Sequence, residues 1–177
     1  MRVIGGLFKG RKLAEFKGNS VRPTSDMARE SLFNILSSRV KGARFLDAFS
    51  GTGAVGIEAL SRGAKCVTFN DLSKESVNII KENLKKLGAV DNAVIKNGDA
   101  VFLMQNSSVK FDIIFLDPPY SSSNVEKILE SASECLADDG IIIFEDEKPI
   151  DITILGLELF DNRKYGRVHF SFFKKGE

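Results

Sequence analysis

The chain is poor in the residues that build metal centres and disulfide frameworks. Its 177 residues include two cysteines, Cys66 and Cys135, and one histidine, His169. The cysteines lie far apart and form no Cys-x-x-Cys motif, so the sequence indicates neither a zinc site nor a redox pair. We therefore expect no metal cofactor and two free thiols, as is typical of proteins in a reducing cytosol.

Long apolar runs are also missing. No stretch approaches the roughly 20 apolar residues that a membrane helix needs, and the first residues lack the apolar core of a secretory signal. The sequence thus predicts a cytoplasmic protein with no membrane partner. Its length suits one domain, and a composition of 43% hydrophobic and 28% charged residues is ordinary for a globular protein. Nothing in it demands more than a monomer.

The formal net charge of +1 hides three regions of different sign. Residues 1–44 carry ten Lys or Arg against three Asp or Glu, residues 45–160 carry ten against nineteen, and residues 161–177 carry five against two. A basic front on an acidic body is typical of a protein that docks on a polyanion such as nucleic acid. A solvated surface with no partner is the alternative.

Strand and helix patterns alternate along most of the chain. A first helix is expected over 25–38, and a second follows the glycine-rich turn and ends at residue 60. Further helices are expected over 73–87, 100–105 and 124–136. Strands are expected over 44–48, 65–70, 93–96, 111–116, 140–144, 152–160 and 167–173. The alternation predicts an α/β fold with a parallel sheet and helices on both faces, closed by an antiparallel hairpin. We take residues 1–24 as a glycine-rich, basic hairpin or arm and residues 25–177 as the main domain.

The first of these helices has a cap and an apolar face that can be assigned from the sequence. Thr24 or Ser25 can cap it. The residues that we expect on its apolar face are Met27, Ala28, Leu32, Ile35 and Leu36.

A glycine-rich turn follows the first predicted strand. Residues 51–56 fit the pattern G-x-G-x-x-G, and Asp71 lies at the end of the next strand. Such a turn lets the backbone approach a dinucleotide while the acid binds ribose, although it can also be a tight structural turn. Asp47 tilts the choice of ligand. Its carboxylate repels a pyrophosphate but attracts the α-ammonium group of S-adenosylmethionine. The turn therefore favours S-adenosylmethionine, with an NAD-binding protein as the alternative.

A third acid, Asp99, follows the third predicted strand. It can cap the next helix, or it can accept from an adenine amino group while the backbone of Ala100 acts as a donor. Taken alone, the cap is the favoured role. Ligands bind at the carboxyl ends of strands in open α/β sheets. Because Asp47 and Asp71 are also expected at strand ends, contact between Asp99 and the ligand is favoured as well.

The strand over 111–116 ends on Asp117-Pro118-Pro119-Tyr120. Two prolines stiffen the chain and cannot pair in a ladder, so the carbonyls before and between them are free to accept hydrogen bonds. An acid, a carbonyl and an aromatic ring can together hold a flat base that carries an amino group. The alternative is a rigid loop, because Asp-Pro often begins a turn.

These motifs resemble those of class I S-adenosylmethionine-dependent amino-methyltransferases, and most closely those of the RsmD family of bacterial 16S rRNA (guanine-N2)-methyltransferases. The segments that carry it include 1–6, 10–13, 22–26, 29–34 and 45–53, and the resemblance runs from residue 1 to the end, including the turn at 165–166 and the closing strand. It implies a Rossmann-like, seven-stranded, mostly parallel sheet with an antiparallel C-terminal hairpin and a short N-terminal β-hairpin extension. It also implies a guanine of 16S rRNA, free or in the small ribosomal subunit particle, as substrate. Adenine-N6 or a DNA amine is the alternative, because the same acceptor motif serves any exocyclic amine.

The resemblance also assigns roles to residues. Catalysis is expected at Asp117, Pro118, Pro119 and Tyr120, with Tyr120 stacking on the base. Expected at the cofactor are Asp47, Phe49, Ser50, Gly51, Thr52, Gly53, Asp71, Leu72, Asp99 and Ala100, together with Arg22 and Thr24. Expected at RNA phosphates are Arg2, Lys9, Arg11, Lys12, Lys17 and Arg22. Phe8 and Phe16 are interpreted as packing residues, His169 as structural, and Glu145 as either a supporting or a solvated residue.

Overall fold

Strands and helices alternate in the structure, a computed structural model that describes residues 1–17, 24–119, 124–150 and 152–176. The strands are β1 (Arg44–Asp47), β2 (Cys66–Asp71), β3 (Ala93–Asn97), β4 (Phe111–Leu116), β5 (Leu136–Asp146), β6 (Leu157–Tyr165) and β7 (Val168–Lys175). The helices are α1 (Asp26–Leu36), α2 (Ala54–Ser61), α3 (Lys74–Leu87), α4 (Ala100–Gln105) and α5 (Val125–Glu134).

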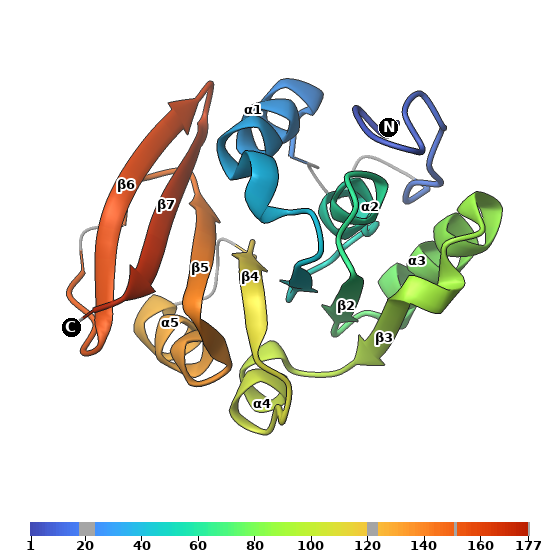
Figure 1. The fold of residues 1–177 in the computed structure, drawn as a ribbon. Coiled ribbons are helices and arrows are strands. Elements are labelled where there is room, and N and C mark those ends of the chain that lie inside the picture. Colours follow the sequence, from blue (N-terminus) through green and yellow to red (C-terminus); the bar gives the residue numbers. More distant parts are fainter. Residues whose placement is uncertain (18–23, 120–123, 151, 177) are drawn as a thin grey trace.

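The strands form one seven-stranded sheet in the order β3-β2-β1-β4-β5-β7-β6 (Figure 1). Neighbours among β1 to β5 pair in parallel, whereas β7 runs antiparallel between β5 and β6. The chain runs outward from β1 to β3 and then crosses back to β4. Such a reversal leaves a crevice at the carboxyl ends of the two central strands. The predicted fold class, including the antiparallel closing hairpin, is confirmed.

Two hydrophobic clusters cover the two faces of the sheet. Phe45 and Phe115 belong to the cluster under α1, α2 and α3, whereas Leu46 and Ile114 belong to the one under α4 and α5. Side chains of a strand alternate between its faces, so strands with both faces buried are apolar along their length. No helix within the described ranges is long and apolar enough to cross a membrane.

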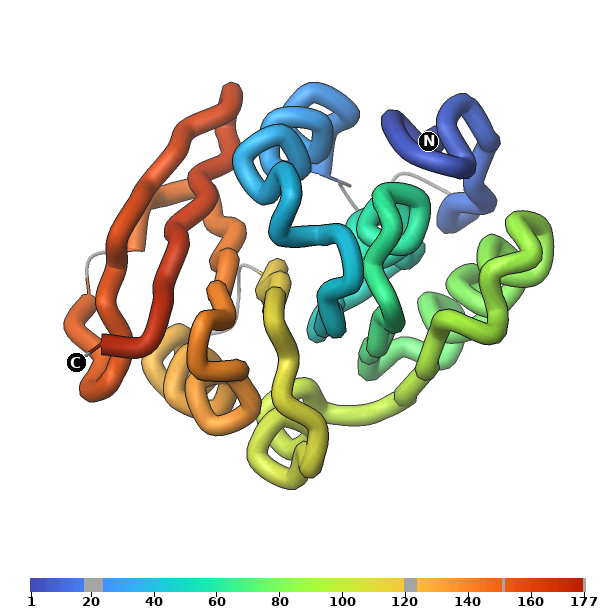
Figure 2. Tube along the Cα trace, in the orientation of Figure 1, coloured from blue at the N-terminus to red at the C-terminus, as the bar shows by residue number. Residues whose placement is uncertain are grey.

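Residues 1–17, the N-terminal segment, fold back on themselves and lie against α2 and α3 (Figures 1 and 2). One antiparallel bridge joins Arg2 to Lys12. The Leu7 N–H donates to the Ser61 carbonyl at 2.7 Å, and the Ala14 N–H donates to Asn83 Oδ1 at 2.6 Å. The side chains of Val3 and Leu13 are buried in the core under these helices. The segment is therefore fixed to the main domain.

The apolar face expected for α1 is partly wrong. Met27 and Ile35 are 61% and 38% exposed, whereas Arg29 is fully buried. The helix turns about 100° per residue, which places Ile35 at the edge of the buried stripe and Met27 on the opposite side of the helix. Arg29 is accommodated because Asp26 and the Arg2 carbonyl accept from its guanidinium at 3.0 and 2.6 Å. The helix cap is Ser25, whose hydroxyl accepts from the Ala28 N–H.

The third glycine of the glycine-rich turn, Gly56, lets α2 pack closely on β2. A Cβ at this position would lie 2.3 Å from Cε1 of the buried Phe69 and 2.9 Å from Cγ1 of Val67. We therefore expect Gly56→Ala to lower the free energy of unfolding by about 1–3 kcal/mol through overpacking. Urea denaturation followed by circular dichroism measures this. Gly98→Ala, whose Cβ would meet no atom within 4 Å, is the control, and equal loss in both variants would contradict the packing argument.

Candidate active site

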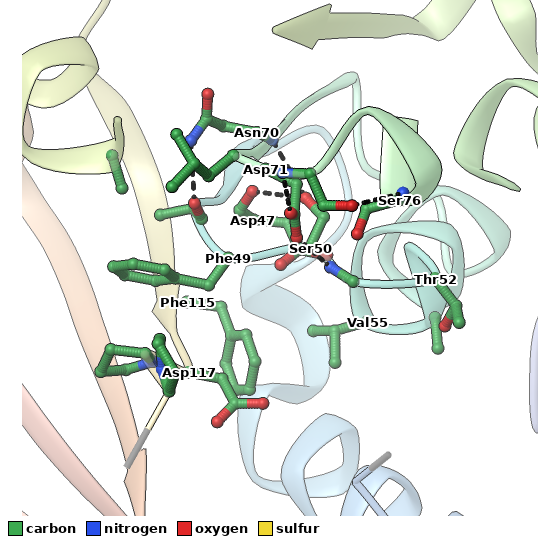
Figure 3. A pocket seen from close by; sticks show the side chains of 18 of the residues that line it. Asp47, Phe49, Ser50, Thr52, Val55, Asn70, Asp71, Ser76, Phe115 and Asp117 are labelled. Carbon is green, nitrogen blue, oxygen red and sulfur yellow. Dashed lines mark hydrogen bonds between the residues drawn. The ribbon is translucent and has the colours of Figure 1, made fainter. Parts of the chain in front are cut away.

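A cavity of about 900 Å³ opens at the carboxyl ends of β1, β2 and β4. Figure 3 shows Asp71 and Ser50 toward one end of it and Asp117 toward the other, with Phe49 and Phe115 between them. The cavity wall thus combines acids at successive strand ends with apolar rings. The residues predicted at the cofactor that line it are Asp47, Phe49, Ser50, Gly51, Thr52, Asp71, Leu72, Asp99, Ala100 and Thr24. Gly53, the remaining described one, is the N-cap of α2.

A hydrogen bond to Asp71 joins the glycine-rich turn to the end of β2. The Gly51 N–H donates to Asp71 Oδ2 at 2.8 Å, and the Ser73 N–H donates to Oδ1 of the same carboxylate at 2.8 Å. Gly51 and Gly53 adopt positive φ angles of 53° and 79°, which glycine reaches without strain. The turn is held in one shape before any ligand arrives, and Asp71 keeps further lone pairs on both oxygens.

Asp47, at the end of β1, is 1% exposed and accepts from the Gly56 N–H at 2.9 Å. Burial raises its pKa to about 7, and the charges of Asp117 and Asp71 act in the same direction. A carboxylate in this environment is stabilised by a cationic partner. The site therefore favours a ligand that brings a positive charge to Asp47.

Asp99 is the N-cap of α4, since its carboxylate accepts from the Phe102 N–H at 2.8 Å. The cap role is confirmed, and Asp99 also lies on the cavity wall. Asn70, which sequence reasoning missed, joins the loops on either side. Its Nδ2 donates to the carbonyls of Ala48 and Gly98, each at 3.1 Å. A buried polar residue at the end of an otherwise apolar strand is the signal that marks it.

Asp117 follows the last residue of β4 and lines the cavity together with Pro118 and Pro119. Burial raises the pKa of Asp117 well above its usual range, and the charges of Glu145 and Asp146 add to the effect. The four aspartates on the cavity wall thus each come from the end of a different strand. No group of His, Cys, Asp or Glu side chains in the described ranges is arranged to hold a metal ion.

Glu145, near the end of β5, is 4% exposed, so the solvated interpretation of this residue is wrong. The Thr24 hydroxyl donates to Glu145 Oε2 at 2.8 Å. Burial raises the pKa of Glu145 to about 7, while the hydrogen bond from Thr24 opposes this shift. Leu116 pairs with Phe144, so Asp117 and Glu145 each come one residue after a paired position. In the sequence, the signal is an acid that directly follows the apolar run 141–144.

The N-terminal segment contributes part of the cavity wall through Met1, Glu15 and Phe16. Phe16 was interpreted as a packing residue, and the structure instead places it on this wall. Phe8 does pack against the hydrophobic core. Tyr120 and Arg22 lie outside the described residues. The basic residues Arg2, Lys9, Arg11, Lys12 and Lys17 are all exposed.

The family model described as conserved hypothetical protein 95 matches residues 1–174. A relative from Haemophilus influenzae, "Ribosomal RNA small subunit methyltransferase D", is 39% identical over 84% of this chain and 79% of its own length. The chain belongs to the RsmD family. The chain is also similar to "Putative rRNA methyltransferase YlbH" of Bacillus subtilis, which is 36% identical over 99% of both chains.

Solved structures agree with the family assignment. The chain superposes on "Putative methyltransferase yhhF from Escherichia coli" with a TM-score of 0.88 and 32% identity, over 99% of this chain and 97% of that one. The RsmD-family chain described above is thus an S-adenosylmethionine-dependent methyltransferase, and the resemblance read from its sequence is confirmed. Its glycine-rich turn belongs to a methyltransferase and not to an NAD-binding enzyme.

Proposed function

We propose that this protein, acting as a cytoplasmic monomer, methylates the exocyclic N2 amine of a guanine in 16S ribosomal RNA. Relatives named for the small-subunit ribosomal RNA support the RNA substrate, and membership of the RsmD family supports the guanine. The observation that carries the proposal is the wall shared by Asp117, Pro118 and Pro119 with Asp47 and Asp71. One cavity thereby offers groups for a methyl donor and for an amine.

The donor set of this cavity fits S-adenosylmethionine. In our proposal Asp47 faces the α-ammonium group, Asp71 accepts from the ribose hydroxyls, and Asp99 with the Ala100 N–H reads the adenine. Phe49 and Leu72 supply apolar surface for the adenine ring. The carboxylates of Asp47, Asp71 and Asp99 on this wall oppose a pyrophosphate but suit a ligand that carries positive charge and no phosphate.

The affinity for S-adenosylhomocysteine should depend on pH through Asp47. The ligand's ammonium favours the ionised carboxylate, so binding releases a proton wherever Asp47 is protonated in the free protein. Because its pKa is raised to about 7, affinity should rise about tenfold per pH unit below that value and level off above it. Isothermal titration between about pH 5.5 and 8 measures this. Asp47→Asn should bind more weakly with a flat profile, and a flat wild-type profile would contradict the role of Asp47.

The residues at the end of β4 act on the amine. When bound, S-adenosylmethionine supplies an electrophilic methyl group: the amine lone pair forms the C–N bond while the C–S electron pair stays on sulfur. Asp117 and the Pro118 carbonyl accept the two N–H groups, which turns the lone pair toward the methyl group. Asp117 also stabilises the positive charge that develops on nitrogen and then takes the released proton. Tyr120 stacks on the base, which has left its helix.

The exposed basic residues of the N-terminal segment provide the phosphate contacts in this proposal. Arg2, Lys9, Arg11, Lys12 and Lys17 are exposed on a segment whose other residues reach the cavity wall, and Arg22 joins them. Residues 1–24 thus serve RNA contact and residues 25–177 methyl transfer. Phosphate contacts give affinity and salt dependence but little choice of sequence.

The proposed function is tested by tritium transfer from labelled S-adenosylmethionine. The substrates are 16S rRNA and small ribosomal subunits from a strain that lacks this protein. We expect label in one of these two substrates, and much less in the same material from a strain that has the protein, because its site is already methylated. Equal labelling of both preparations, or of neither, would argue against the proposal.

A further inference from the structure

Glu145, near the carboxyl end of the inner strand β5, is a buried acid with no part in the proposed reaction. Glu145 is 4% exposed, yet it lies next to the position that follows the end of β4. In the same strand, Ile143 belongs to the core under α1, α2 and α3, and Glu145 pairs with Phe170 of that core. Since side chains alternate along a strand, Glu145 points to the face on which Phe115 and the cavity lie.

A hydrogen bond connects this carboxylate with the start of α1. Thr24 lies on the cavity wall, and its hydroxyl donates to Glu145 Oε2 at 2.8 Å across 121 residues of sequence. The residue after Thr24 caps α1. The bond therefore fixes the entry to α1 on the end of β5, and it leaves the lone pairs of Thr24 Oγ1 available as acceptors.

A buried acid that makes only this connection would be a costly way to hold a loop, because burying a carboxylate is unfavourable unless its charge is used. Its charge acts on Asp117, whose pKa is raised by burial and then by Glu145. Other charged or titratable groups on the elements around Glu145 include Asp47 on β1, Asp146 on β5, His169 on β7, and Asp26, Arg29 and Glu30 on α1. Arg29 Nη2 donates to Asp26 and to the Arg2 carbonyl, and Arg29 Nε lies 3.9 Å from Glu58.

We infer that Glu145 is a positioning residue for methyl transfer: through Thr24 it fixes the cavity wall, and through its charge it makes Asp117 a stronger acceptor for the amine's proton. Glu145 itself touches neither the amine nor the methyl donor. The inference rests on the methyl transfer proposed above. It extends the site to a further strand end, on β5, and gives the segment before α1 a role in the reaction.

The test is the pH dependence of kcat for Glu145→Gln, measured at saturating S-adenosylmethionine and RNA so that cofactor binding does not contribute. Glutamine keeps the shape and can still accept from Thr24, but it carries no charge. Removal of a neighbouring negative charge lowers the pKa of Asp117, so the acidic limb of the profile should move to lower pH. The maximal kcat should fall by about tenfold, because a less basic group accepts the proton less well. The KM for S-adenosylmethionine should stay close to wild type.

Asp138→Asn is the matched control, since Asp138 lies at the opposite end of β5, where its carboxylate is exposed and pairs with Lys175. Its profile should overlay that of the wild type. A Glu145→Gln profile with an unmoved acidic limb would overturn the inference, even if kcat fell. If Glu145→Gln does not fold, Thr24→Val decides: kcat should fall and be restored in Thr24→Ser, and full activity of Thr24→Val would overturn the inference. A wild-type protein that transfers no methyl group would instead refute the proposed function.

Discussion

Replacing Asp117 with asparagine should lower kcat for methyl transfer by about 10²–10⁴-fold, the usual contribution of a positioned proton acceptor. Asparagine can still accept one hydrogen bond from the amine, but it cannot take the proton or balance positive charge on nitrogen. Asp117 lies at the end of the cavity away from Asp71 (Figure 3). The affinity for S-adenosylhomocysteine should therefore stay close to that of the wild type.

Single-turnover transfer to 16S rRNA and isothermal titration with S-adenosylhomocysteine separate these two effects. Asp112→Asn is the matched control, because Asp112 lies at the opposite end of the same strand and pairs with Arg44 near the surface. Its kcat should equal that of the wild type. Wild-type kcat in Asp117→Asn would contradict the role assigned to the acid at the end of β4.

Glu58→Gln should lower the free energy of unfolding by about 3–5 kcal/mol, the usual cost of removing one charged partner from a buried ion pair. Glu58 is fully buried and accepts from the N–H groups of Ile4 and Gly5, each at 2.8 Å. It also accepts from Arg62 Nε at 2.8 Å and lies 3.9 Å from Arg29 Nε. Loss of its charge leaves the buried guanidinium of Arg29 without its second carboxylate and weakens the attachment of the N-terminal segment to α2.

Urea unfolding followed by circular dichroism measures this loss, since the chain has no tryptophan to report by fluorescence. Glu82→Gln is a close control: Glu82 and Lys86 form a helical i,i+4 pair like Glu58 and Arg62, but both side chains are about half exposed. Exposed pairs of this kind contribute about 0.3–0.5 kcal/mol. Equal destabilisation by the two variants would refute the anchoring role of Glu58. Faster proteolysis within residues 1–17 should accompany Glu58→Gln alone.

The sequence predicts the architecture well because the relevant signals are local. Ser73 caps α3 and Gly88 ends it in the left-handed conformation, as side-chain caps and glycine at a helix end commonly do. The acids Asp47, Asp71 and Asp117 lie at the cavity because the carboxyl ends of parallel strands meet at one edge. Tyr120 and Arg22 stay predictions.

The buried charges could not be predicted in the same way. Arg29 and Glu58 are charged residues within predicted helices, and charged helix residues are normally expected at the surface. Their burial depends on partners that lie far away in the sequence. The same holds for Glu145, whose partner Thr24 precedes it by 121 residues. Hydrophobic periodicity locates apolar side chains only. It therefore cannot predict the burial of a charged side chain whose partners come from distant parts of the sequence.

The identity of the methylated nucleoside tests the central claim most directly. Small-subunit rRNA from a strain that lacks this protein is incubated with the protein and S-adenosylmethionine, digested to nucleosides and examined by mass spectrometry. We expect N2-methylguanosine to appear with the wild type and to form about 10²–10⁴-fold more slowly with Asp117→Asn. Methyl label in N6-methyladenosine, or in no nucleoside, would contradict it.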